Sequence, residues 1–146
     1  MEEHIEKFPT VPLFHGLEAQ EIARILRDAE DVPTEPGQVI IEQGKSGEGL
    51  YVIGAGVFEV VHAADGAESV LARLEELSFF GEMSLFDQSS AAATVICREP
   101  GRLKRFSGSV FHGLLDRNDM VALRMTYNIA GMLARRLAKV DDRLVS

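Results

Sequence analysis

The stretch that decides the fold, residues 50–74, reads LYVIGAGVFEVVHAADGAESVLARL. It contains three short runs rich in branched and aromatic residues, at positions 50–53, 57–62 and 70–74. Glycines and the dipeptide Asp65-Gly66 separate these runs, and no segment of helical period lies between them. Because such runs are typical of strands joined by tight turns, the stretch predicts consecutive strands of an antiparallel sheet.

The same character extends outward over residues 31–106. Further β-rich runs lie at positions 39–41, 92–97 and 103–106, and Pro36-Gly37 forms a turn dipeptide in which proline presets φ and glycine accepts a positive φ. Many short strands without intervening helices favour an antiparallel sandwich, barrel or jelly roll over a parallel α/β sheet. The expected class is therefore mainly β with flanking helices, built as a double-stranded β-helix (jelly roll).

Both ends of the chain show a helical period instead. In residues 18–29, apolar side chains recur at helical spacing, which predicts a short amphipathic helix. Beyond a short helical segment near 110–114, a long helix is expected to begin at Asn118 as N-cap, with Asp119 in its first turn, and to run to about Leu144.

With 146 residues, the chain has the common size of one domain. We expect a single domain over residues 1–146. Its parts are an N-terminal helical segment (1–30), a β-roll (31–106) and a hinge with a long C-terminal helix (107–146).

An apolar seam follows the long helix. Its members alternate steps of three and four residues, the spacing of a coiled-coil pair: Leu123, Thr126, Ala130, Leu133, Leu137, Val140 and Leu144. The plainer interpretation is a helix packed on its own domain. We expect a parallel homodimer through this helix, with Leu123, Ala130, Leu133, Leu137 and Val140 at the interface.

The charge balance limits the partners. The chain has 15 basic and 23 acidic residues and a net charge of -8, which disfavours phosphate backbones and anionic membranes. We therefore expect no specific contact with nucleic acid and no membrane association. Residues 1–7 are charged and the single cysteine, Cys97, lies in an apolar run, so we expect a cytoplasmic protein without disulfides.

Familiar catalytic motifs are lacking in the sequence. Gly44-Lys45-Ser46 resembles the end of a P-loop, but the required earlier glycine falls at Val39 and a strand follows. Residues 54–59 miss the dinucleotide fingerprint because Glu59 replaces its last glycine. The four histidines are scattered and have no partner at metal-ligand spacing. We expect a non-enzymatic protein with no catalytic residue and no metal site.

One stretch, residues 80–95, reads FGEMSLFDQSSAAATV and indicates a ligand site. Gly81 allows a close backbone turn and Glu82 supplies a carboxylate. Residues 83–86 can form one helical turn whose N–H groups point at an anion. A small-anion site held in a β-rich frame is therefore a reasonable hypothesis.

This stretch resembles the phosphate-binding cassette of the cyclic-nucleotide-binding domain family, in particular the effector domain of catabolite activator proteins. The resemblance covers nearly the whole chain. Its motifs are Pro12-Leu13-Phe14, Gly16-Leu17, Pro36-Gly37, Gly44, Gly47, Gly49-Leu50-Tyr51, Gly54-Ala55-Gly56 and Leu133-Ala134-Arg135-Arg136-Leu137. It implies a jelly roll, a hinge and a dimerising helix, and it implies regulation by a bound cyclic nucleotide.

The resemblance also implies residue roles. In the family the cassette glutamate binds the ribose 2′-hydroxyl, backbone amides and an arginine hold the cyclic phosphate, and the long helix closes over the base. The ligand-binding positions that carry over are Gly81, Glu82, Met83, Ser84, Ala91, Ala92, Val140 and Asp141. The family pattern Arg-Ala-Ala-Thr reads Ala91-Ala92-Ala93-Thr94 here, and the base-contacting pair falls on Val140 and Asp141.

Loss of the arginine predicts altered binding. A hydrogen bond to a charged group contributes about 1.5–3 kcal/mol, and a buried charge without its partner costs about 3–5 kcal/mol. Affinity for a cyclic nucleotide should then fall roughly tenfold to several-thousandfold. Backbone amides near Met83 and Ala92 with nearby hydroxyls, or the cations Lys45 or Arg73, are the alternatives that could restore an anion site.

Three functional hypotheses follow. The first is a regulatory sensor module that weakly binds a cyclic nucleotide or related small anion, or that binds another ligand. In this hypothesis a hinge near residues 106–116 couples the site to the dimer helix. The second is a ligand-free dimerisation module, in which Glu82 caps its own turn and the alanines fill a strand. The third is an effector-domain fragment of a transcription regulator, since these residues include no helix-turn-helix.

Overall fold

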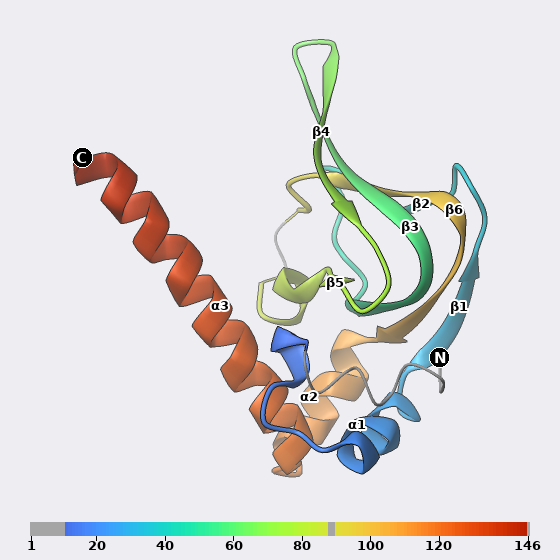
Figure 1. Ribbon diagram of the computed structural model, residues 1–146, viewed down its shortest axis with the longest axis vertical. Helices are drawn as coiled ribbons and strands as arrows, with labels where there is room; N and C mark the ends of the chain where they lie inside the picture. The colour runs from blue at the N-terminus through green and yellow to red at the C-terminus, as the bar shows by residue number, and fades with distance from the viewer. Residues whose placement is uncertain (1–10, 88–89, 146) are drawn as a thin grey trace.

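The protein forms an antiparallel β-roll with helices at one end and a long helix that leaves it (Figure 1). The computed structural model describes residues 11–87 and 90–145, with side chains described as far as Lys139. The elements in chain order are η2 (Pro12–Phe14), α1 (Ala19–Leu26), β1 (Glu30–Thr34), β2 (Val39–Ile41), β3 (Leu50–Ala64), β4 (Ala67–Leu74), β5 (Phe79–Phe80), η3 (Glu82–Leu85), β6 (Thr94–Phe106), α2 (Gly108–Asp116) and α3 (Met120–Val145). The mainly β class with flanking helices is confirmed.

The sheet is antiparallel throughout, with the strand order β1-β6-β3-β4. In addition, β2 pairs with β6 and β5 pairs with β3. Consecutive strands β3 and β4 form the hairpin that projects in Figure 1. Asp65 and Gly66 both have positive φ (54° and 78°), which is the geometry of a two-residue hairpin turn, so this predicted turn is confirmed.

Two long strands replace four expected short ones. The runs at 50–53 and 57–62 belong to the single strand β3, and those at 92–97 and 103–106 belong almost entirely to β6. The register of this pair shifts between Ile53 and Phe58. At Gly56, where φ is 96°, a Cβ atom would lie 2.6 Å from the Cα of Gly101. The backbones of β3 and β6 therefore approach each other closely at these two glycines. The glycines therefore mark a bend within a strand, not its end.

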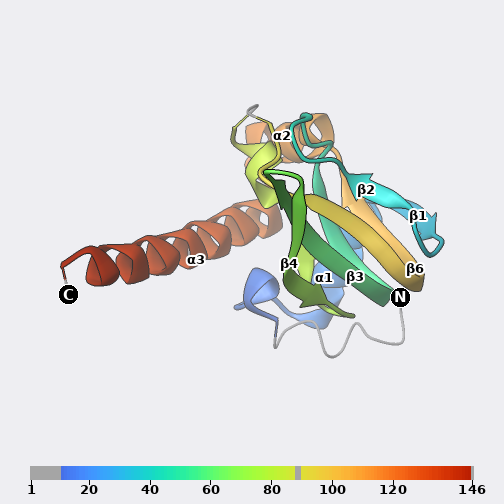
Figure 2. The same ribbon diagram turned by 90° about the horizontal axis from the view of Figure 1, so that it is seen from above.

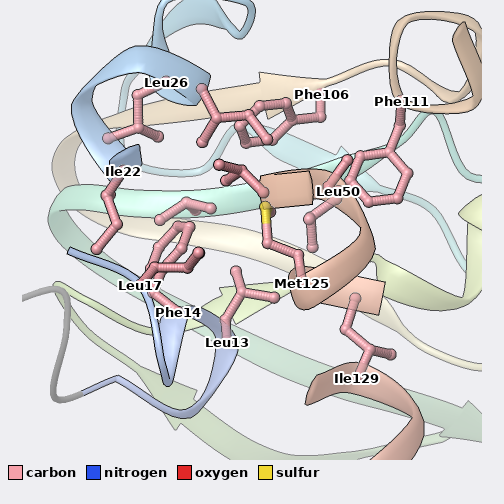
Figure 3. Close-up of a cluster of buried hydrophobic side chains, with 14 of the residues drawn as sticks. Leu13, Phe14, Leu17, Ile22, Leu26, Leu50, Phe106, Phe111, Met125 and Ile129 are labelled. Atoms are coloured by element: carbon pink, nitrogen blue, oxygen red, sulfur yellow. The ribbon is translucent and has the colours of Figure 1, made fainter. Parts of the chain in front are cut away.

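The core has two clusters. The first lies beneath the roll, where η2, α1, α2 and the start of α3 contact the strands, and Figure 3 shows Phe14, Ile22, Phe106, Phe111 and Met125 among its side chains. The second fills the roll itself and contains Ile41, Tyr51, Ile53, Phe58, Phe80, Val95, Cys97 and Leu103. Each fully buried large side chain contributes about 1.5–3 kcal/mol. The first cluster therefore holds the helices against the sheet, and the second holds the strands of the roll together.

The start of the long helix differs from the expectation. Asn118 has a φ of 58° and is not the cap. The cap is Asp119, whose Oδ1 accepts hydrogen bonds from the backbone N–H groups of Val121 (3.0 Å) and Ala122 (3.1 Å). Arg24 of α1 also donates to this oxygen (2.9 Å), which joins the two helices. Asn118 instead supplies the left-handed turn between α2 and α3, a conformation that asparagine tolerates.

The part of α3 up to Leu133 packs on the core of its own domain. Val121, Ala122, Met125 and Ile129 are buried, and the Asn128 side chain donates hydrogen bonds to the carbonyl oxygens of Leu13 and His15. From Ala134 onward the described side chains are exposed, and the helix extends away from the roll (Figure 2). No helix in the described part of the chain is both long enough and apolar enough to cross a membrane.

Candidate functional site

The predicted cassette lies at the end of β5, where the chain turns into η3. Gly81 has a φ of 82°, and a Cβ atom there would lie 2.5 Å from the carbonyl oxygen of Gly49, so only glycine fits this corner. The Ser84 hydroxyl closes the turn because it accepts from the Gly49 N–H (3.1 Å) and lies 2.7 Å from the Gly81 carbonyl oxygen. The expected helical turn is present, as a 3₁₀ turn that starts at Glu82.

Beside this turn the roll encloses a cavity of about 470 Å³, within the usual size range of small-molecule sites. Its apolar wall consists of Ile41, Val60, Phe80, Ala91, Ala92, Ala93 and Val95. Its polar and turn residues are Gly47, Gly81, Glu82, Met83, Ser84, Asp87, Ser90 and Arg136. The six cassette positions expected to bind ligand therefore line one cavity.

The cation of the cavity comes from the long helix. Arg136 of α3 reaches across, and its Nη1 lies 3.4 Å from Oε1 of Glu82. The Glu82 side chain is 13% exposed, whereas that of Arg136 is 62% exposed, so the carboxylate belongs to the roll and the guanidinium to the rim. Among the described contacts, the Glu82 carboxylate meets the guanidinium of Arg136, so it is directed at α3.

The two cations named as alternatives to the missing arginine, Lys45 and Arg73, do not line the cavity. Lys45 forms an ion pair with Glu42 (3.1 Å), and Arg73 pairs with Glu75 and Glu99 at another part of the roll. Arg136 was not among the predicted site residues. Its signal was the Leu133-Ala134-Arg135-Arg136-Leu137 motif, which pattern alone assigns to the polar face of a helix.

The position of the missing arginine lies within the cavity wall. Ala91 lines the cavity and packs against the core cluster inside the roll. Its backbone N–H donates to the Lys45 carbonyl oxygen (2.8 Å), and its own carbonyl oxygen accepts from the Gly44 N–H (2.9 Å). The backbone here is thus fixed, while the side chain offers a methyl group and no charge. Val140 and Asp141 lie on α3 beyond Arg136, but their side chains are outside the described residues.

The exposed stripe of α3 has a different register from the predicted seam. Along α3, exposed residues that are mostly apolar recur at steps of three and four and form one solvent-facing stripe: Met120, Leu123, Tyr127, Ala130, Ala134 and Leu137. Leu123, Ala130 and Leu137 belong to both sets. Leu133, by contrast, packs against the core of its own domain. A hollow of about 620 Å³ lies beside this stripe, between η2 and α3, and Tyr127 is part of its lining.

Two further features of the described residues are their potential metal ligands and the single cysteine. None of their histidine, cysteine, aspartate and glutamate side chains form a group of three that could hold a metal ion. Cys97 is fully buried, and its Sγ lies 3.3 Å from the Thr34 hydroxyl and 3.0 Å from the Glu99 carbonyl oxygen.

A β-roll with a cavity beside a helical turn, and a long helix that contributes a side chain to the same cavity, is the architecture of a small-ligand-binding domain. The chain belongs to the cyclic nucleotide-binding domain family, whose family model matches residues 32–118. Regulators are prominent among its relatives.

The cyclic AMP receptor protein of Thermus thermophilus is 33% identical over 134 residues, which are 91% of this chain and 60% of that protein. A cAMP-dependent protein kinase regulatory subunit of Mucor circinelloides is 36% identical over 94 residues, which are 64% of this chain and 22% of the subunit. This chain thus spans less than two thirds of the length of either relative.

The crystal structure of Thermus thermophilus catabolite activator protein superposes with a TM-score of 0.81 at 31% identity. The superposition covers 91% of this chain and 61% of that one. The predicted family and jelly-roll fold are therefore confirmed.

Proposed function

We propose that this chain is a non-enzymatic cytoplasmic sensor module in which ligand occupancy beside Glu82 is reported by α3 to a second copy of the chain. The observation that carries the proposal is the contact between Glu82 and Arg136, because it joins the ligand cavity to the output helix directly. A ligand that competes for Glu82, or that bridges it to Arg136, changes the free energy of this contact. Allostery requires such a difference between two states.

Selectivity is expected to be altered relative to cyclic-AMP-binding members of the family. The wall position occupied by Ala91 presents no charge, and Lys45 and Arg73 are engaged elsewhere. A cyclic phosphate would have to draw Arg136 from Glu82 or remain unpaired. We therefore expect cyclic AMP to bind weakly, with a dissociation constant higher than that of family members that keep the arginine.

The output in this proposal is a homodimer. The exposed stripe that includes Leu123, Tyr127 and Leu137 follows coiled-coil spacing. It runs along the same helix that carries Arg136, and Leu137 is the next residue after Arg136. A shift of Arg136 toward or away from the cavity would rotate or tilt the helix, and the stripe with it. Two copies packed along this stripe would transmit the change to each other.

Hydrogen exchange tests this proposal on the full chain. We expect saturating ligand, with millimolar cyclic AMP and adenosine as the probes, to change the protection of residues 82–87 and also of residues 120–139. In Glu82→Gln the response should disappear from both segments, while Glu59→Gln, which alters an ion pair with Arg98 outside the cavity, should respond like the wild type. Protection that changes in the cassette but not in α3 would refute the coupling.

A second candidate, a ligand-free dimerisation module, is favoured by the methyl group at Ala91 and by the exposed stripe. It predicts no ligand response and a stable dimer. The third, an effector-domain fragment of a transcription regulator, is consistent with the chain's 60% coverage of the Thermus thermophilus receptor. The net charge of -8 disfavours DNA binding by these residues, which a mobility shift at low salt would check.

A further inference from the structure

The electrostatic composition of the cavity indicates which class of ligand it accepts. Three charged side chains line it among the described residues: the carboxylates of Glu82 and Asp87 and the guanidinium of Arg136. Two negative charges and one positive charge leave a net charge of -1. Gln88 and Ser89, which follow Asp87 in the chain, are uncharged residues.

These charges are not equivalent. Asp87 is exposed at the rim, where water screens it. Glu82 is mostly buried, and Arg136 is its ion-pair partner. The inner part of the cavity is therefore electrically balanced before any ligand enters. An anionic ligand would find no further cation among the described lining side chains, and at Ala91 the wall offers a methyl group instead.

Moving Arg136 to an anion does not solve this problem. If the guanidinium turned to a phosphate, the Glu82 carboxylate, whose side chain is only 13% exposed, would lose its partner. Separating this pair offsets part of what the new contact gains, although the pair itself is weak because Arg136 is mostly exposed. A neutral ligand avoids the conflict, because its hydroxyl groups can donate to Glu82 while the ion pair with Arg136 persists.

The remaining surface favours a ligand with an apolar body. Ile41, Val60, Phe80 and Val95 form one wall, and this wall offers no side-chain hydrogen bonds. The polar end is confined to the turn at Glu82. A ligand with hydroxyl groups at one end and a flat, weakly polar ring at the other matches this division, and the cavity of about 470 Å³ has room for a molecule of that size.

We propose that the cavity selects an uncharged, hydroxyl-bearing ligand of the nucleoside class over the corresponding cyclic nucleotide. The inference rests on the proposed function only in placing the ligand at Glu82. It adds that the ligand carries no phosphate, and it assigns the selectivity to the balanced Glu82–Arg136 pair and to Ala91.

Calorimetry on the unaltered full chain is the primary test, with adenosine, 2′-deoxyadenosine and cyclic AMP as probes. We expect adenosine to bind at least about tenfold more tightly than cyclic AMP, since one charge-assisted hydrogen bond alone accounts for such a ratio. Removal of a hydroxyl in 2′-deoxyadenosine should weaken binding by a similar factor. Cyclic AMP binding as tightly as adenosine, or more tightly, would overturn the inference.

Ala91→Arg provides the reciprocal test, with Ala91→Gln as a control of similar reach without charge. The arginine variant should gain at least about tenfold in cyclic AMP affinity and reverse the order of the two ligands, whereas the glutamine variant should not. Thermal unfolding of both variants checks that they fold, and the wild-type comparison stands without them.

The outcomes separate the two proposals. If Ala91→Arg binds cyclic AMP but the wild type binds neither probe, the inference on neutral ligands is refuted and the sensor module survives. If adenosine binds the wild type without any change in the protection of α3, the inference survives and the proposed coupling fails. If no ligand binds any of the proteins, both are refuted.

Discussion

His112 of α2 lies 2.6 Å from the carbonyl oxygen of Leu85, the last residue of η3. Because a carbonyl oxygen can only accept, the Nε2 atom of His112 carries the proton in this contact. The contact ties the cassette turn to the hinge helix, which leads directly into α3. The cassette therefore contacts the C-terminal helices twice, through His112 of α2 and through Arg136 of α3.

The hydrogen bond of His112 predicts a stability effect that depends on the donor. His112→Phe should lower the free energy of unfolding by about 1–3 kcal/mol, since it leaves the partly buried Leu85 carbonyl oxygen without its partner. His112→Gln, which keeps an N–H donor, should recover much of this loss. Urea unfolding measures both, and equal losses in the two variants would show that ring packing matters and the hydrogen bond does not.

Arg136→Ala should have little effect on stability. Its ion pair with Glu82 is long and more than half exposed on the arginine side, so we expect a change below about 1 kcal/mol in the free energy of unfolding. The ligand-induced change in hydrogen exchange of α3 should nevertheless be lost. Arg135→Ala, on the neighbouring position of the same helix, is the matched control. A large loss of stability in Arg136→Ala alone would mean that the contact is structural.

Asp119 predicts a pH dependence of stability. Burial alone would raise the pKa of its carboxyl group, but hydrogen bonds from Arg24 and from the Ala122 and Val121 backbone lower this pKa below the ordinary value of 3.8. A lowered folded-state pKa contributes stability that is fully present above the unfolded value and is lost as the pH falls through the folded value. Below about pH 4, Tm of the wild type should therefore fall more steeply than that of Asp119→Asn.

Asp119→Asn retains the cap but not the charge, so it should be less stable than the wild type at pH 7. Differential scanning calorimetry between pH 2 and pH 7 compares the two. Parallel Tm curves for the two proteins over this range would contradict the role given to Asp119.

The exposed stripe of α3 predicts which substitutions separate association from folding. Leu137→Lys and Tyr127→Lys should give monomers of unchanged stability, since these side chains are 62% and 70% exposed in the single chain. Leu133→Lys should also lower the free energy of unfolding, because Leu133 packs against the core of its own domain.

Sedimentation velocity and urea unfolding together test these three variants. A monomeric wild type would refute the dimer. Monomers formed by Leu133→Lys but not by Tyr127→Lys would restore the seam predicted from sequence.

The sequence by itself determined the class and order of the elements. Runs rich in branched and aromatic residues, the Asp65-Gly66 turn and the helical period at both ends predict a β-roll between helices. Local chemistry is sufficient for this because each signal involves neighbouring residues. The stretch from Gly81 to Ala92 also identified part of the cavity lining, whereas the uncharged position at Ala91 was identified only through the resemblance to the family cassette.

The tertiary structure decided what depends on distant partners. Whether Gly56 ends a strand or bends it depends on Gly101, 45 positions later. The cap Asp119 forms local bonds to its helix, but its link to α1 depends on Arg24, 95 positions earlier. The partner of Glu82 and the solvent-facing stripe of α3 depend on how the helix leaves the roll. A helix pattern shows which residues share a face, but the packing of the whole domain selects the face that is left for a ligand or a second chain.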